Sequence, residues 1–109
     1  MALADMLRDD GHRVEAFDAP SSVPPLESLG HVAVLVTDYQ LPESNGLEFA
    51  DAFHTAYPSV PIILVTADPC SHLDGAAGSR PYVQLHRKPI DYRTLNASIR
   101  KGLAHDRVR

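Results

Sequence analysis

Apolar positions along the chain follow a strand-like pattern in four segments. Residues 32–36 and 61–67 are continuous, β-branched-rich apolar runs, which are typical of strands buried on both faces of a sheet. Residues 12–17 alternate between polar and apolar side chains, and residues 82–85 form a fourth short stretch with strand character. We therefore expect four strands.

Helical spacing of apolar residues separates these strands. Residues 2–10, 47–57 and 92–103 each place apolar side chains three or four positions apart, which predicts amphipathic helices. Residues 68–80 are polar and rich in small residues, so any helix there is weak. Strands that alternate with helices predict an α/β fold, in which a doubly wound parallel sheet carries helices on both faces.

Composition narrows the class of protein. With 109 residues the chain is expected to form a single domain over residues 1–109, and 44% hydrophobic with 22% charged residues is ordinary for a globular protein. No apolar run reaches the roughly 18 residues of a membrane span, so we expect a cytoplasmic protein without a membrane partner. The net charge of −4 argues against nucleic acid as a partner. Cys70 has no second cysteine to pair with, and Cys70 with His72 is too few ligands for a zinc site.

Three polar residues follow the ends of successive predicted strands. Asp38 and Thr66 close the two apolar runs, and Lys88 follows the last predicted strand, 50 residues after Asp38. The carboxyl ends of parallel strands meet at one edge of a sheet, where ligands bind in such folds. A carboxylate can act as a nucleophile toward phosphorus, while an ammonium and a hydroxyl can bind the oxygens of the transferred group. The pattern therefore predicts a phosphoryl-accepting site.

With these residues in place, the chain resembles the receiver domain of bacterial response regulators. The matching text is LVTDYQLPESNGLEF at 35–49, PIILVTA at 61–67 and KP at 88–89, and the resemblance spans essentially the whole chain. It implies a flavodoxin-like receiver fold and a signalling domain rather than an enzyme.

The same resemblance implies a role for each site residue. Asp38 would accept a phosphoryl group from a histidine kinase or a phosphotransfer protein, Thr66 would be the switch hydroxyl and Lys88 the neighbouring cation. Mg²⁺ would bind the Asp38 carboxylate and the backbone carbonyl of Gln40. The Lys88–Pro89 peptide bond would be cis, an isomer that is accessible mainly before proline.

The chain also departs from the receiver pattern. It starts inside what resembles the first helix, so the first strand and its Mg²⁺-binding acidic pair are missing; we therefore expect an N-terminally truncated fold with an incomplete, weakened Mg²⁺ site. Asp9 and Asp10 lie at a helix end and are expected to be solvated rather than to replace that pair. Leu85 stands where receivers usually have an aromatic switch residue.

Two alternatives follow from these departures. The first is a receiver-like interaction module that no longer takes phosphate, with homodimerisation as a possible consequence of a missing central strand. The second is a phosphohydrolase with an aspartate nucleophile. It is disfavoured because such enzymes generally carry a D-x-D motif, with a second acidic residue two positions after the nucleophile, and this chain has Gln40 there. If the chain acts as receiver domains do, we expect partners to contact one face of it. That face consists of residues 68–80, residues 82–85 and the last helix.

Overall fold

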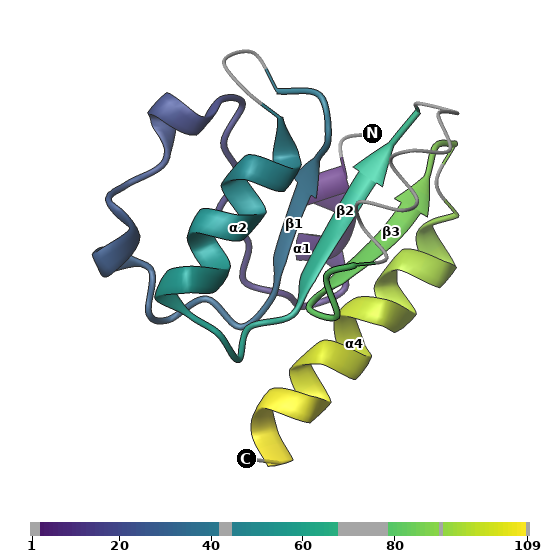
Figure 1. Ribbon diagram of the computed structural model, residues 1–109. Helices are drawn as coiled ribbons and strands as arrows, with labels where there is room; N and C mark the ends of the chain where they lie inside the picture. Colours follow the sequence, from purple (N-terminus) through teal and green to yellow (C-terminus); the bar gives the residue numbers. More distant parts are fainter. Residues whose placement is uncertain (1–2, 42–44, 68–78, 90, 109) are drawn as a thin grey trace.

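The computed structural model describes residues 3–41, 45–67, 79–89 and 91–108, and only the backbone for 104–108. Two short 3₁₀ turns follow the first helix, and after them a helix lies between the first two strands and another follows the last strand (Figure 1). In chain order the elements are α1 (Leu3–Asp9), η1 (Pro20–Ser22), η2 (Leu26–Ser28), β1 (Leu35–Asp38), α2 (Gly46–Ala56), β2 (Ile62–Thr66), β3 (Val83–Arg87) and α4 (Tyr92–Val108).

The strands form one parallel sheet in the order β1-β2-β3. Leu35 pairs with Ile62 and Ile62 pairs with Val83, so the three strands begin together and run in register toward the same edge. This arrangement confirms the parallel α/β fold. The sheet has three strands within the described part of the chain, one fewer than the four expected.

Residues 12–17 are the predicted strand that the sheet lacks, and they run as irregular chain. Their polar groups bond elsewhere: Arg8 donates to the Val14 carbonyl at 3.2 Å, and the His12 ring bonds the Asn96 side chain at 2.9 Å. A strand is stable only when a neighbour satisfies its backbone groups. No described strand pairs with this segment. It packs through Val14 against the α1 and α4 side of the sheet.

Burial along the sheet differs between the two apolar runs. Every residue of β2 is buried, as expected for the central strand. In β1, by contrast, Leu35 and Val36 are half-buried and Asp38 is exposed, so the prediction of burial on both faces is wrong for this strand. The reason is position: among the described residues, β1 has a paired neighbour on one side only. Its first ladder bond runs from the Leu35 amide to the Pro61 carbonyl, so β1 also starts three residues later than predicted.

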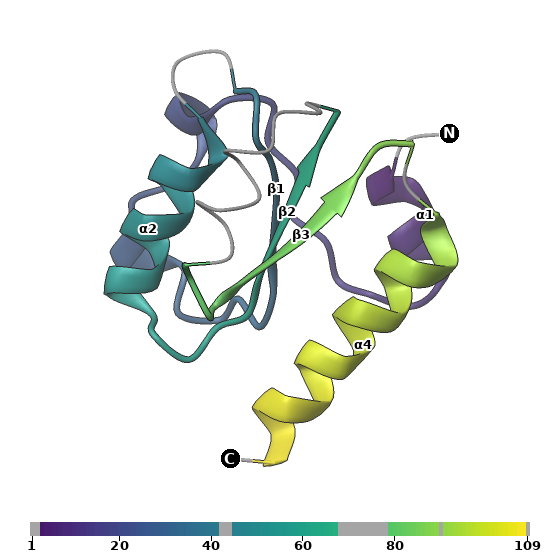
Figure 2. The ribbon, with the colours of Figure 1, turned by 45° about the vertical axis from the view of Figure 1, so that its right-hand side comes forward.

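The helices form two layers (Figure 2). On one face α1 and α4 pack Leu7, Leu95 and Ile99 against Ile63 and Val65 of the central strand. On the other face α2 buries Ala50 and Phe53 against Ile62, and η2 closes that cluster through Leu29 just after it. Within the described residues, no helix is long and apolar enough to cross a membrane.

The start of α2 is fixed against the end of β1. The side chain of Asn45 caps the helix by accepting a hydrogen bond from the Glu48 amide at 3.0 Å. Gly46 then lies so close to β1 that an added Cβ would be 2.2 Å from the Asp38 carbonyl oxygen and 2.7 Å from Leu64 Cδ1. Only glycine allows this approach, and the approach holds α2 directly behind Asp38.

Candidate functional site at the carboxyl edge of the sheet

The three predicted site residues lie at the same edge of the sheet. Asp38 is the last residue of β1, Thr66 is the last residue of β2, and Lys88 directly follows β3. The register brings them together, because Asp38 is level with Val65 and Thr66 is level with Arg87. Parallel pairing alone therefore places a carboxylate, a hydroxyl and an ammonium on three adjacent strand ends.

Asp38 and Lys88 form an ion pair. Lys88 Nζ lies 3.2 Å from Asp38 Oδ1, and the two side chains are 47% and 51% exposed. A pair this exposed contributes little to stability, so the fold does not depend on it. Both groups remain accessible to a reagent arriving from solvent.

Thr66 differs from its neighbours because only 2% of its surface is exposed. It is one of two buried polar residues among those described, the other being Thr37. The Lys88 amide donates to the Thr66 carbonyl at 2.7 Å, and the peptide bond that follows, Lys88–Pro89, is cis as expected. The main chain therefore fixes the origin of the lysine side chain relative to β2.

Comparison with known proteins identifies the family. The model of the response regulator receiver domain matches residues 1–100. The chain belongs to this family. Receiver domains are signalling domains of two-component systems, and they interact with histidine kinases or phosphotransfer proteins. A search of curated proteins found no match.

Solved structures support the same receiver fold. A response regulator receiver protein from Sinorhizobium medicae WSM419 superposes with a TM-score of 0.76 at 21% identity, covering 94% of this chain and 82% of that one. The signal receiver domain of an HD domain-containing protein from Pseudomonas fluorescens Pf-5 superposes with a TM-score of 0.67 at 27% identity. The match covers 77% of this chain and 68% of that one. NtrX from Brucella abortus superposes with a TM-score of 0.75 at 23% identity. The match covers 97% of this chain and 24% of NtrX.

Receiver domains typically use Mg²⁺, and the described residues fit that ion poorly. Mg²⁺ prefers six oxygen ligands in an octahedron at short distance. The Asp38 carboxylate and the Gln40 backbone carbonyl would be the ligands that the resemblance implies, but no group of three or more His, Cys, Asp or Glu side chains suited to a metal is present in the described ranges. The incomplete metal site expected from the sequence stays a prediction.

Asp10 has a structural role that the sequence did not reveal. Its carboxylate accepts hydrogen bonds from the Tyr92 hydroxyl and from Asn96 Nδ2, the latter at 3.3 Å, and thereby joins the end of α1 to the start of α4. The hydrogen bond to Asp10 raises the pKa of Tyr92 to about 12. Asp10 is exposed, as expected for a helix end, but its carboxylate is hydrogen-bonded to side chains of α4.

A second polar cluster joins α2 to the chain before β3. The Asp51 carboxylate accepts from Arg80 Nε at 2.7 Å, from Arg80 Nη2 at 2.9 Å and from the Tyr82 hydroxyl at 2.6 Å. The hydrogen bonds from Arg80 lower the pKa of Asp51 to about 2, against a smaller effect of burial, and the Tyr82 hydroxyl adds to the lowering. The His54 ring stacks on Tyr82 with centroids 3.6 Å apart. No sequence pattern links residues 29 to 31 positions apart, so this cluster was not foreseen.

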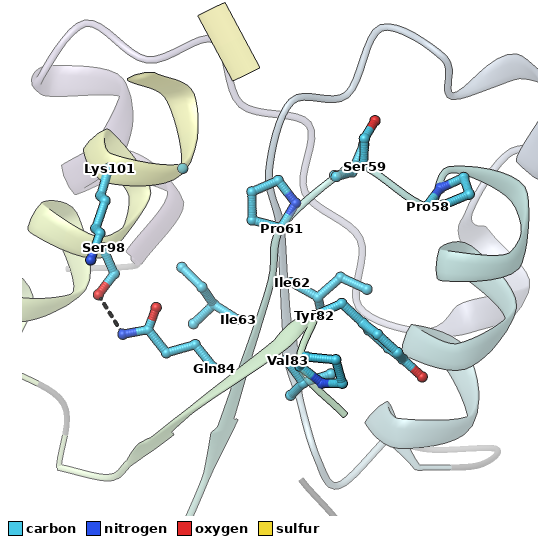
Figure 3. A pocket seen from close by; sticks show the side chains of 13 residues that line it. Pro58, Ser59, Pro61, Ile62, Ile63, Tyr82, Val83, Gln84, Ser98 and Lys101 are labelled. Atoms are coloured by element: carbon cyan, nitrogen blue, oxygen red, sulfur yellow. Dashed lines mark hydrogen bonds between the residues drawn. The ribbon is translucent and has the colours of Figure 1, made fainter. Parts of the chain in front are cut away.

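A shallow cavity lies at the opposite end of the sheet (Figure 3). It has a volume of about 400 Å³ and lies between the start of β2, the start of β3 and α4. Ile62 and Val83 contribute apolar walls, and Gln84 is held by a 2.9 Å hydrogen bond to Ser98. Because β2 and β3 start at the edge opposite Asp38, this cavity is separate from the carboxyl-edge site.

Of the remaining residues that the sequence singled out, some lie outside the described part of the chain and one lies in β3. Cys70 and His72 lie outside the described residues, as does most of the predicted weak helix at 68–80. Leu85 lies within β3, where it is partly buried and packs against Leu64 and Leu47. It therefore contributes to the core on the α2 side of the sheet.

Proposed function

We propose that this chain is the phosphoryl-accepting receiver of a cytoplasmic two-component phosphorelay, with Asp38 as the acceptor. The observation that carries the proposal is the exposed Asp38–Lys88 pair, 3.2 Å apart at the carboxyl edge of the sheet beside Thr66. The donor is the phosphohistidine of a histidine kinase or of a phosphotransfer protein. Family membership supports this donor, because receiver domains interact with such proteins.

The transfer is a displacement at phosphorus. An Asp38 carboxylate oxygen forms the new O–P bond while the P–N bond of the phosphohistidine breaks, and the electron pair of that bond returns to the imidazole nitrogen. The Lys88 ammonium lies where it can bind an oxygen of the transferring group and stabilise the charge that develops there. The product is an aspartyl phosphate on Asp38 and a free histidine on the donor.

The phosphorylated state is then reported through Thr66. A phosphoryl group on Asp38 presents acceptor oxygens beside the end of β2, and the Thr66 hydroxyl turns toward them. Thr66 is buried in the present state. A movement of its side chain therefore changes packing within the sheet, which is how a local charge becomes a change in the surface that partners meet.

Labelling with a small phosphoramidate donor tests the proposal. The 109-residue chain is incubated with the donor and analysed by intact mass, alongside Asp38→Asn as the matched variant. We expect the mass of one phosphoryl group to appear on the wild type and not on Asp38→Asn. Equal labelling of both proteins, or labelling mapped by digestion to another residue, would contradict Asp38 as the acceptor.

One observation favours a second candidate function. Among the described residues no group of three or more His, Cys, Asp or Glu side chains is suited to a metal, so the chain also suits a receiver-like interaction module that signals without phosphorylation. The same labelling experiment separates the two functions. No label on the wild type under any donor would favour the interaction module.

A further inference from the structure

The oxygen atoms around Asp38 are largely in use by the protein itself. The Tyr39 carbonyl accepts from the Gly46 amide at 2.6 Å, and the Val65 carbonyl accepts from the Tyr39 amide at 2.8 Å. The Thr66 carbonyl accepts from the Lys88 amide.

The carbonyl of Asp38 itself is no better placed to bind an ion. It accepts from the Thr37 hydroxyl at 3.0 Å and is covered by Gly46. The Gln40 carbonyl, the candidate ligand that the family resemblance implies, is not among these bonded carbonyls.

The carboxylate of Asp38 already has a cation. Lys88 Nζ lies 3.2 Å from Asp38 Oδ1, within the range of a direct ion pair. A divalent ion on the same carboxylate would stand a few ångströms from this ammonium and be repelled by it. Such repulsion must be offset by further anionic ligands, and among the described residues no group of three or more His, Cys, Asp or Glu side chains is suited to a metal.

We infer that Lys88 is the resident counter-ion of Asp38 and that the carboxyl-edge site of this chain works without Mg²⁺. Metal affinity rises with the number of anionic oxygens around the ion, and within the described residues Asp38 belongs to no group of three or more metal-binding side chains. The consequence for phosphorylation rests on the proposed function: transfer to Asp38 is slow, since one ammonium stabilises less charge than a bridging divalent ion, and it is indifferent to Mg²⁺.

Metal binding is tested directly by nuclear magnetic resonance. Amide shifts of the ¹⁵N-labelled 109-residue chain are followed through a titration with millimolar MgCl₂, with NaCl at matched ionic strength and Asp38→Asn as backgrounds. We expect no saturable shift at Asp38, Gln40 or Thr66 beyond those backgrounds. A saturable Mg²⁺ response at these amides that Asp38→Asn abolishes would overturn the inference.

The Lys88→Gln variant separates ligand number from competition by the lysine. If too few anionic oxygens limit binding, Lys88→Gln also shows no saturable Mg²⁺ response. If removal of the ammonium alone creates a Mg²⁺ site, then the oxygens present suffice, and the argument from ligand number is overturned.

Phosphorylation rates keep the inference and the proposed function distinguishable. With a small acyl phosphate, we expect equal slow labelling of Asp38 in MgCl₂ and in EDTA, and a loss of roughly tenfold in Lys88→Gln. Saturable acceleration by Mg²⁺ would overturn the inference and leave Asp38 as the acceptor. Absence of label in both conditions, with no Mg²⁺-dependent shifts, would overturn phosphoacceptance and leave the metal-free site standing.

Discussion

The Asp51–Arg80–Tyr82 cluster yields the most quantitative prediction. The pKa of Asp51 falls from 3.8 to about 2, mainly through its hydrogen bonds from Arg80, which corresponds to roughly 2.4 kcal/mol at most. Because the Asp51 side chain is 41% exposed and Arg80 26% exposed, solvent screening reduces this to about 1 kcal/mol. Asp51→Asn should therefore lower the melting temperature by about 4 °C for a chain of this length.

The pH dependence of this stabilisation has a defined sign. The pKa of Asp51 is lower in the folded state than in the unfolded state, so the stabilisation is fully present above about pH 4. It is lost as the pH falls through about 2, the pKa of the folded state. The difference in free energy of unfolding between wild type and Asp51→Asn should therefore narrow between pH 4 and pH 2.

Urea denaturation of four proteins measures the coupling. Wild type, Asp51→Asn, Arg80→Met and the double variant form a cycle, with Asp5→Asn as control because Asp5 pairs with Arg8 at 3.5 Å with side chains 58% and 49% exposed. We expect a coupling energy of about 1 kcal/mol in the cycle, and a loss of unfolding free energy below about 0.5 kcal/mol in the control variant Asp5→Asn. A coupling energy near zero, or an Asp51→Asn loss that does not narrow in acid, would refute the reasoning.

Three further predictions concern the rest of the fold. Gly46→Ala should lower stability by about 2 kcal/mol or more, because its Cβ would meet the Asp38 carbonyl at 2.2 Å; an unchanged melting temperature would show that α2 can shift freely. Leu64→Ala should cost about 2–5 kcal/mol in urea denaturation, since Leu64 is fully buried in the central strand, and a loss below that range would mean that the site collapses around the cavity. Tyr92→Phe should remove a phenol titration near pH 12 from the ultraviolet absorbance, because Asp10 holds the pKa of Tyr92 there; its stabilising effect is present below pH 10 and lost as the pH rises through 12, and a titration unchanged by the substitution would contradict the assignment.

Periodicity predicted the central part of the fold. The continuous apolar run 61–67 predicts a strand buried on both faces, and β2 is buried throughout. The edge that carries Asp38, Thr66 and Lys88 could also be predicted, because parallel strands bring their carboxyl ends together. Whether Asp38 accepts phosphate remains a prediction.

What the pattern could not predict depends on neighbours in space. The run 32–36 has the composition of a central strand, yet β1 begins at Leu35 and is half-exposed because its partner lies on one side only. Residues 12–17 alternate like a strand but have no described partner to complete a ladder. The ion pair between Asp51 and Arg80 joins two segments that are far apart in the sequence. Their proximity follows from the assembled sheet, so the sequence pattern could not predict it.

The pairing of β1 on one side only, within the described residues, places the charged residue Asp38 on an edge strand. Leu35 and Tyr39 direct their amides at the β2 side, so by alternation the amides of Val36 and Asp38 face the other side, where no described strand pairs. Such an edge can recruit strands from other molecules, and a charge on it is a common protection. Asp38→Asn therefore removes a charge from this edge together with the proposed phosphoryl acceptor, and this variant is best compared with the wild type at low protein concentration.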